Sequence, residues 1–251
     1  MIEKIMKRIT ILAIAIIASV ASLSAQQEEY KSISLHHKAL NEIQSSLPTV
    51  INIVDGNEGE ISVSYPTSVE ELIKVEIWYD ALLIERKDEN STREELKALN
   101  EKQPIRIEVC SSKIKSILNT SDMSLNIHRD SFANWLEIIN TSTLFINGKS
   151  LTAKDKIELY NTGTMTSNIK GYTADNLMLT NTGYLYVKGK ATAKYIEQNS
   201  TGIESTDLDV ECRKLNITST GSGVITYRGT TDEVDIISTG RAIIRTSELN
   251  K

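Results

Sequence analysis

The chain has 251 residues and carries 28 Lys and Arg residues against 33 Asp and Glu residues, a formal net charge of −5. An acidic chain without a basic cluster excludes nucleic acid as the expected partner, because phosphate groups are bound by Lys and Arg. Only two Phe and two Trp residues stand beside nine Tyr residues, so the core must be thin and aliphatic.

The first 25 residues have the pattern of a secretory signal peptide. A basic start precedes the uncharged apolar run 9–20, and small residues follow in 21–25. Cleavage after Ala25 is preferred, and cleavage after Ala21 is the alternative. An uncleaved membrane anchor is the competing interpretation, but the apolar run is shorter than the span of about 20 residues that a bilayer requires. We therefore expect an exported protein whose only membrane contact is this cleaved segment.

Residues 26–47 form a polar N-terminal segment, and residues 48–251 are expected to form one domain. Within 48–104, two alternating apolar runs flank a Gly-containing turn at 55–59, which predicts a β-hairpin between residues 50 and 65. This hairpin is expected to cap the domain, because an uncovered end would expose a flat strand edge.

Two further short strands are predicted at 75–78 and 82–84. Residues 88–101 mix acidic and basic side chains, which predicts a short helix or loop insertion exposed to solvent. Pro104 ends this insertion, and a repeat region begins at residue 105.

Residues 105–251 repeat with a period near 20. A tripeptide of Asn or Ser, then Thr, then Gly or Ser closes each repeat, and the last residues of seven successive tripeptides are 21, 21, 20, 19, 19 and 19 residues apart. A fixed period of this length is typical of a solenoid. Apolar and polar residues alternate on both sides of each tripeptide, which indicates strands and not helices. The fold predicted is an all-β parallel β-helix of about seven or more rungs.

The tripeptides are predicted to form the corners of the coil. In a parallel β-helix equivalent residues lie above one another at about 4.8 Å, so stacked amide side chains can form hydrogen bonds along the column. The closing Gly is expected to turn the chain by adopting a positive φ. A ligand-binding stripe is the functional interpretation, but a structural role is preferred because every turn carries the column equally. The corner ladder comprises Asn119, Asn140, Asn161, Asn181, Ser200, Ser219 and Ser238, with Gly163, Gly183, Gly202, Gly221 and Gly240 as closing residues.

No disulfide, catalytic or metal-binding role is expected for the cysteines and histidines. In the stacked register Cys110 and Cys212 lie five rungs apart, roughly 24 Å, which exceeds the reach of a disulfide. Both are therefore predicted to be free thiols without a neighbouring His. His36, His37 and His128 have no accompanying Cys or carboxylate cluster that would complete a metal site. No catalytic residue, metal or cofactor is predicted.

An outward column of carboxylates is the strongest argument for an enzyme, since parallel β-helices include polysaccharide lyases and hydrolases. Those reactions need paired carboxylates or a carboxylate, metal and basic cluster at fixed separation. The column is interrupted by uncharged residues and has no aligned His, so a solvated face is preferred, with weak Ca²⁺ binding as the runner-up. It comprises Glu137, Glu158, Glu197 and Asp235, interrupted by Met178 and Asn216.

Four aromatic residues on outward positions are the candidate binding residues: Phe145, Tyr160, Tyr184 and Tyr186. Exposed aromatic rings on a flat sheet can stack against sugars or pack against a partner. The alternative is that they are ordinary isolated surface residues.

From about Leu47 to Arg245 the sequence resembles the bacterial family known as putative auto-transporter adhesin, head GIN domain. The resemblance rests on the order of features, ending in Gly221-Ser-Gly-Val-Ile-Thr-Tyr-Arg-Gly229. The chain departs from the family in the charged insertion and in Thr-Gly or Thr-Ser corners where many relatives have Ser-Gly. The resemblance implies a right-handed coil in exported proteins of Bacteroidetes-like bacteria, located in the periplasm or at the surface of a Gram-negative cell. It implies no reaction or cofactor.

The function expected is therefore that of an exported, non-enzymatic β-solenoid, either an adhesin-like protein or a binding or structural protein of the cell envelope. The alternative is a glycan-binding or glycan-active parallel β-helix. A glycan or a cell-envelope protein is the expected partner, and end-to-end self-association is a further expectation, because residues 247–251 provide little cover for the last rung.

Overall fold

The computed structural model of the chain describes residues 29–88, 99, 103–129 and 131–250. The expected signal peptide and most of the insertion 88–101 lie outside these residues. Within them, no helix is long and apolar enough to cross a membrane. The strands are β1 (Tyr30–His36), β2 (Glu42–Ser45), β3 (Thr49–Ile53), β4 (Glu60–Pro66), β5 (Ile73–Trp78), β6 (Ala81–Arg86), β7 (Ile105–Cys110), β8 (Ser116–Asn119), β9 (Asp122–Ile127), β10 (Trp135–Asn140), β11 (Thr143–Thr152), β12 (Lys156–Asn161), β13 (Thr164–Asn181), β14 (Tyr184–Ser200), β15 (Ile203–Ser219), β16 (Ser222–Ser238) and β17 (Arg241–Asn250), with one 3₁₀ helix, Thr67–Val69.

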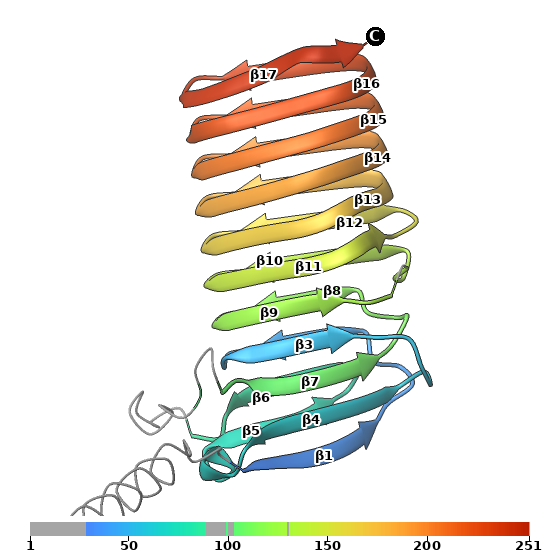
Figure 1. Ribbon diagram of the computed structural model, residues 1–251, viewed down its shortest axis with the longest axis vertical. Helices are drawn as coiled ribbons and strands as arrows, with labels where there is room; N and C mark the ends of the chain where they lie inside the picture. Colours follow the sequence, from blue (N-terminus) through green and yellow to red (C-terminus); the bar gives the residue numbers. More distant parts are fainter. Residues whose placement is uncertain (1–28, 89–98, 100–102, 130, 251) are drawn as a thin grey trace, which may run out of the picture. The chain divides into compact units, whose positions relative to one another are not determined.

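These strands form a parallel β-solenoid of about seven stacked turns (Figure 1). We call the strands that lead into the corners the first sheet; it contains β2, β8, β10, β12 and the C-terminal parts of β13 to β16. The second sheet contains the strands that leave the corners: β3, β9, β11, the N-terminal parts of β13 to β16, and β17. A short third side, which includes residues 190–193 of β14, connects the two sheets. The predicted fold class is thus confirmed.

The corner residues stack in one file. Asn140 pairs in register with Asn119 below it and with Asn161 above it. The Nδ2 atom of Asn119 donates to Oδ1 of Asn140 (2.7 Å), and Asn140 and Asn161 repeat this bond to their upper neighbours at 2.8 and 2.9 Å. Asn181 continues the file to Ser200 at 3.3 Å. Each buried amide is thereby hydrogen-bonded, so burying the polar column carries little desolvation penalty.

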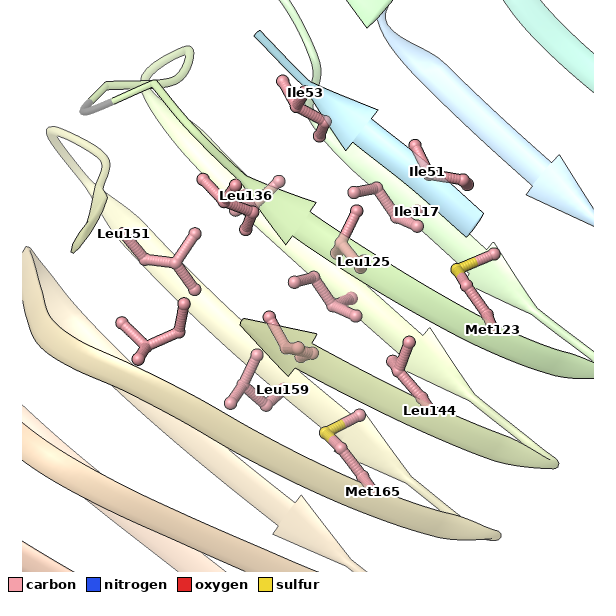
Figure 2. Close-up of a cluster of buried hydrophobic side chains, with 14 of the residues drawn as sticks. Ile51, Ile53, Ile117, Met123, Leu125, Leu136, Leu144, Leu151, Leu159 and Met165 are labelled. Atoms are coloured by element: carbon pink, nitrogen blue, oxygen red, sulfur yellow. The ribbon is translucent and has the colours of Figure 1, made fainter. Parts of the chain in front are cut away.

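The core is a narrow layer of aliphatic side chains between the two sheets. Figure 2 shows Leu144 and Met165 from the second sheet and Leu136 and Leu159 from the first sheet projecting into this layer. All four are at most 1% exposed. The alternation read from the sequence therefore sorts inward from outward side chains in the described turns of the coil.

The N-terminal strands correct the predicted hairpin between residues 50 and 65. Both apolar runs are strands, β3 and β4, but they do not pair as a simple hairpin, because β7 lies between them. β7 pairs in parallel with β3 and antiparallel with β4, while the other edge of β3 pairs in parallel with β9. The antiparallel hairpin of this region is β5 with β6, connected through Tyr79 and Asp80. A strand with alternating apolar residues can pair with a neighbour along either of its edges. The alternation alone therefore did not identify which strands pair with β3 and β4.

The coil also begins earlier in the sequence than residue 105. β2, within the polar segment 26–47, pairs in parallel with β6 on one side and β8 on the other. Its Ile43 is fully buried, as is Leu40 just before it. One turn of the coil is therefore built from residues 40–53 and is inserted between turns that follow much later in the chain.

The corner glycines allow the backbones of neighbouring turns to approach closely. They do not adopt a positive φ, which corrects the reason expected for their presence. None of the five corner glycines, all within the described residues, has a positive φ. A Cβ atom added to Gly202 would lie 2.1 Å from the carbonyl oxygen of Gly183 in the preceding turn, far inside van der Waals contact. The absence of a side chain is what allows neighbouring corners to stack.

We predict that Gly202→Ala destabilises the protein by about 1–3 kcal/mol, because the new methyl group must push two stacked corners apart. The matched control is Gly171→Ala, since a Cβ atom at Gly171 would meet only the carbonyl oxygen of Lys149, at 3.9 Å. Urea unfolding followed by circular dichroism measures both changes. Equal stability of the two variants would contradict the explanation.

Candidate functional site

Three of the four predicted aromatic residues lie together on the outer face of the second sheet. Phe145 and Tyr186 occupy one column, separated by Thr166 in the intervening turn. Tyr184 occupies the neighbouring column, next to Thr164. Phe145 is 44% exposed and Tyr184 is 43% exposed, so both rings present much of their surface to solvent. We call Phe145, Tyr184 and Tyr186 the aromatic face.

Tyr160 does not belong to this face. It lies in β12 of the first sheet, in register with Thr180, immediately before the corner. The chain turns between Tyr160 and the second sheet, so its ring projects from a different side of the coil. The sequence pattern identified it as outward but did not separate the two sheets.

A second ladder of amides flanks the aromatic face, and the sequence analysis missed it. Asn126, Asn147 and Asn168 lie two residues beyond the aromatic column on the same outer face. Asn126 donates to Asn52 (3.0 Å), Asn147 to Asn126 (3.4 Å) and Asn168 to Asn147 (3.2 Å). The recurrence of Asn at positions 126, 147 and 168, each 21 residues apart, was the available signal. This ladder holds polar donors and acceptors in a fixed row beside the aromatic rings.

The aromatic face ends at a small cavity of about 270 Å³ beside Phe145. Apolar side chains dominate its walls, including Pro48, Val50 and Pro104. Ser124 and Thr143 add hydroxyl groups to the rim. A shallow apolar cavity with a few polar groups next to an exposed ring is a common form of binding subsite.

A longer groove of about 790 Å³ runs along the third side, where no site was predicted. Its walls repeat from turn to turn: Thr173 is in register with Thr192, and Ala174 with Ala193. Charged residues of both signs border it, and Lys194 binds Asp175 across neighbouring turns at 2.6 Å. Three basic and three acidic side chains line the groove, so it carries no formal net charge that would select an anionic or a cationic ligand.

The acidic column of the first sheet is aligned as the sequence predicts, and three of its four carboxylates contact a neighbouring Lys or Asn side chain. Glu137 and Glu158 are in register, and Glu158 forms an ion pair with Lys156. Asp235 is bound by Lys214 at 2.7 Å. Among the described residues no group of three or more His, Cys, Asp or Glu side chains is arranged to hold a metal ion. This geometry supports the interpretation of the column as a solvated face.

Both cysteines are free thiols, as predicted. Burial raises the pKa of the Cys110 and Cys212 thiols, which favours the protonated form over the nucleophilic thiolate. The Cys212 sulfur contacts the hydroxyl of Thr231 at 3.4 Å. Neither thiol therefore has the environment of an activated nucleophile.

A buried polar cluster interrupts the apolar interior near the C-terminal end, and the sequence analysis missed this as well. Glu204 is 2% exposed and occupies the inward column that Leu185 fills one turn earlier. Gln198 donates to its carboxylate at 2.7 Å and Ser219 at 3.2 Å. Tyr227, from β16, donates in turn to Gln198 at 2.5 Å. The available signal was a charged residue at a position where the preceding turns carry Leu or Met.

Gly223 allows the backbone of the next turn to lie close to Glu204. It lies directly above Glu204, and an added Cβ atom would come within 1.9 Å of the Glu204 carbonyl oxygen. Its φ is +122°, a conformation that disfavours other residues. The Gly-Ser-Gly segment that supported the family resemblance thus has a structural explanation in this chain.

Comparison with known proteins gives a consistent family assignment. The family described as putative auto-transporter adhesin, head GIN domain, matches residues 39–251. A putative adhesin from Bacteroides fragilis NCTC 9343 is 18% identical, with a TM-score of 0.68 over 86% of this chain and 96% of that chain. A putative adhesin from Parabacteroides distasonis ATCC 8503 is 12% identical, with a TM-score of 0.61 over 87% and 98%. A putative lipid binding protein from the same organism is 13% identical, with a TM-score of 0.50 over 88% and 98%. No curated protein matches significantly.

The buried carboxyl group of Glu204 is expected to make the stability of the protein depend on pH. Burial raises the pKa of Glu204, and hydrogen bonds from Gln198, Ser200 and Ser219 oppose the rise. Because the folded-state pKa exceeds the unfolded-state pKa, the contribution of Glu204 to stability is greatest at acidic pH and is lost as the pH rises through the folded-state pKa. The facing titratable group, Tyr227, stays neutral there because burial raises its pKa too.

Glu204→Gln should therefore melt at a higher temperature than the wild type at neutral pH. This difference in melting temperature should disappear at about pH 4, where the carboxyl group is protonated in both states. Glu211→Gln, an exposed position in the same strand, is the matched control and should leave the pH dependence unchanged. Thermal melts by circular dichroism across this pH range measure both. Wild-type and Glu204→Gln melting temperatures that differ by the same amount at every pH would contradict this account.

Proposed function

The chain belongs to the family described as putative auto-transporter adhesin, head GIN domain, and we propose that it is an exported, non-enzymatic adhesin-like protein that binds through the outer face of its second sheet. The observation that carries this proposal is the juxtaposition of the aromatic face with the row of outward Asn side chains on rigid, hydrogen-bonded strands. Aromatic rings supply apolar contact area, and the amides supply hydrogen bonds in fixed positions.

The chemistry of this face suits an extended ligand with alternating apolar and hydroxylated surfaces, such as a glycan of the cell envelope. Sugar rings stack on exposed Phe and Tyr, and their hydroxyl groups pair with amides. Contacts repeated at strand spacing add up when one ligand spans several turns, so individually weak contacts give useful affinity. The small cavity beside Phe145 provides an apolar subsite at one end of the face.

The absence of an enzymatic role is part of the proposal. Burial favours the neutral form of the thiols, and Glu158 and Asp235 of the acidic column are paired with Lys156 and Lys214. The buried Glu204 lies between the sheets, where a polymer cannot reach it. The alternative, a glycan-active coil, requires that a bound glycan be cleaved.

A glycan array probed with the purified protein tests the proposal. Replacing Phe145 and Tyr186 together by Ala is expected to weaken binding about tenfold or more, because stacking contact is lost on both turns. Tyr160→Ala and Tyr195→Ala are matched controls, since both rings are exposed on the first sheet, and they should bind as the wild type does. Unchanged binding by the double variant would exclude the aromatic face, and release of a shortened glycan would establish the enzymatic alternative.

Export has its own test. If residues 1–25 are removed as a signal peptide, the mature protein from the native envelope begins at Gln26 and carries a net charge of −7, because three basic residues and one Glu are lost. Intact mass spectrometry of the protein recovered from cell fractions measures the first residue and the location together. A full-length mass in the membrane fraction would show an uncleaved anchor instead.

A further inference from the structure

The C-terminal end of the solenoid has two strand edges that nothing in the described part of the chain covers. The C-terminal part of β16, residues 233–238, pairs with β15 on one edge only. β17 lies above the N-terminal part of β16 and above its third side, and it too is paired on one edge only. Figure 1 shows these strands as the last layer of the coil. Free edges of this kind accept another strand readily.

The interior of the coil is open at the same place. Ile236 is 43% exposed, whereas Ile217, which precedes it in the same inward column, is 1% exposed. Ile237 and Ile243, on outward positions of the two free edges, are 63% and 54% exposed. Three large aliphatic side chains are thus concentrated in one layer, and covering them would remove substantial apolar surface from water.

The two free edges carry opposite charge. Glu233 and Asp235 lie on the first-sheet edge, and Arg241 and Arg245 lie on the second-sheet edge. The two carboxylates contact Lys214 from the turn before. Arg241 and Arg245 are exposed and form no ion pair with any described residue. One edge is therefore acidic, and the other presents guanidinium groups with no carboxylate beside them.

We propose that two copies of the chain join end to end through these edges, so that residues 233–238 of each copy pair with residues 241–245 of the other. The first-sheet strand runs into the corner and the second-sheet strand runs out of it. A twofold axis parallel to the strands therefore brings each edge onto the opposite edge of the partner in antiparallel orientation.

The side chains fit one register of this pairing. Asp235 lies opposite Arg245 and Ile237 opposite Ile243 on the outer face. On the inner face Ile236 lies opposite Ile244 and Ser238 opposite Ala242, so the two open cores close on each other. Cross-strand pairs of opposite charge and of aliphatic residues are stabilising, whereas like charges directly opposite are destabilising. The other twofold arrangement, with the first sheet on the first sheet, would oppose acidic residues with acidic residues and Arg with Arg.

The dimer contact lies at the end of the coil, whereas the aromatic face lies on its side, so the two surfaces can be tested separately. The proposed pairing predicts that the protein sediments as a dimer and that the dimer does not grow further, because the twofold contact consumes the end of each copy. Analytical ultracentrifugation over a dilution series measures this. A monomer at all concentrations, or species that keep growing beyond the dimer, would overturn it.

Charge reversal tests the register. Asp235→Arg and Arg245→Asp are each expected to weaken the dimer about tenfold or more, and the combination of both should restore it, because the pair is re-formed with opposite polarity. Asp232→Arg, an exposed position beyond the pairing strand, is the matched control and should have little effect. Failure of the double variant to recover association, with a circular dichroism spectrum like that of the wild type, would refute the pairing.

Disulfide trapping provides an independent measurement in a Cys212→Ser background. Ile237→Cys combined with Ile243→Cys should give a covalent dimer on a non-reducing gel, since facing residues of neighbouring strands come within disulfide reach. Neither single variant should crosslink, and Ile203→Cys, an exposed residue on the second sheet, should remain monomeric on the gel. Crosslinking of Ile237→Cys alone would show the first-sheet edges facing each other and overturn the proposed arrangement.

Discussion

The whole molecule depends on one constraint, namely that each turn of backbone must lie directly on the next at strand spacing. Hydrogen bonds between the side-chain amides of Asn119, Asn140 and Asn161 satisfy the polar groups that this stacking buries at the corners. Corner glycines such as Gly202 make the approach sterically possible. A side chain in the interior must therefore suit the turn above it and the turn below it at the same time. The outward side chains are free of that requirement, so the surface can vary from turn to turn without disturbing the scaffold.

The buried cluster around Glu204 shows how strictly the interior rule applies. A carboxylate takes the place of an aliphatic side chain here because Gln198 and Ser219 donate hydrogen bonds to it. A substitution in one turn is thus compensated in the next turn and across the corner. Tyr227, from the turn after Glu204, completes the cluster by donating a hydrogen bond to Gln198.

The sequence was informative where the structure is periodic. The spacing of the tripeptides predicts the solenoid, and the alternation around them predicts which residues face inward, as Leu144 and Leu159 do. It could not order the N-terminal strands, because β3 has the same alternating pattern whether it pairs with β4 or with β7. Nor could it separate Tyr160 from Tyr184, since outward position in a strand does not specify the sheet. The outer Asn ladder, in contrast, was visible as a 21-residue recurrence and was overlooked.

The inserted position of β3 has a consequence for how the chain folds during synthesis. Both neighbours of β3, β7 and β9, emerge from the ribosome more than fifty residues later, so β3 itself has no strand to pair with when it first appears, although β2 of the same turn can pair with β6 earlier. Most solenoids can grow from any seed by adding adjacent repeats. Here β3 must wait, as an apolar strand without a partner, until residues 105–127 have been made. This turn of the coil is therefore completed when β3 is enclosed between two strands made later, and not when one repeat is added to the next.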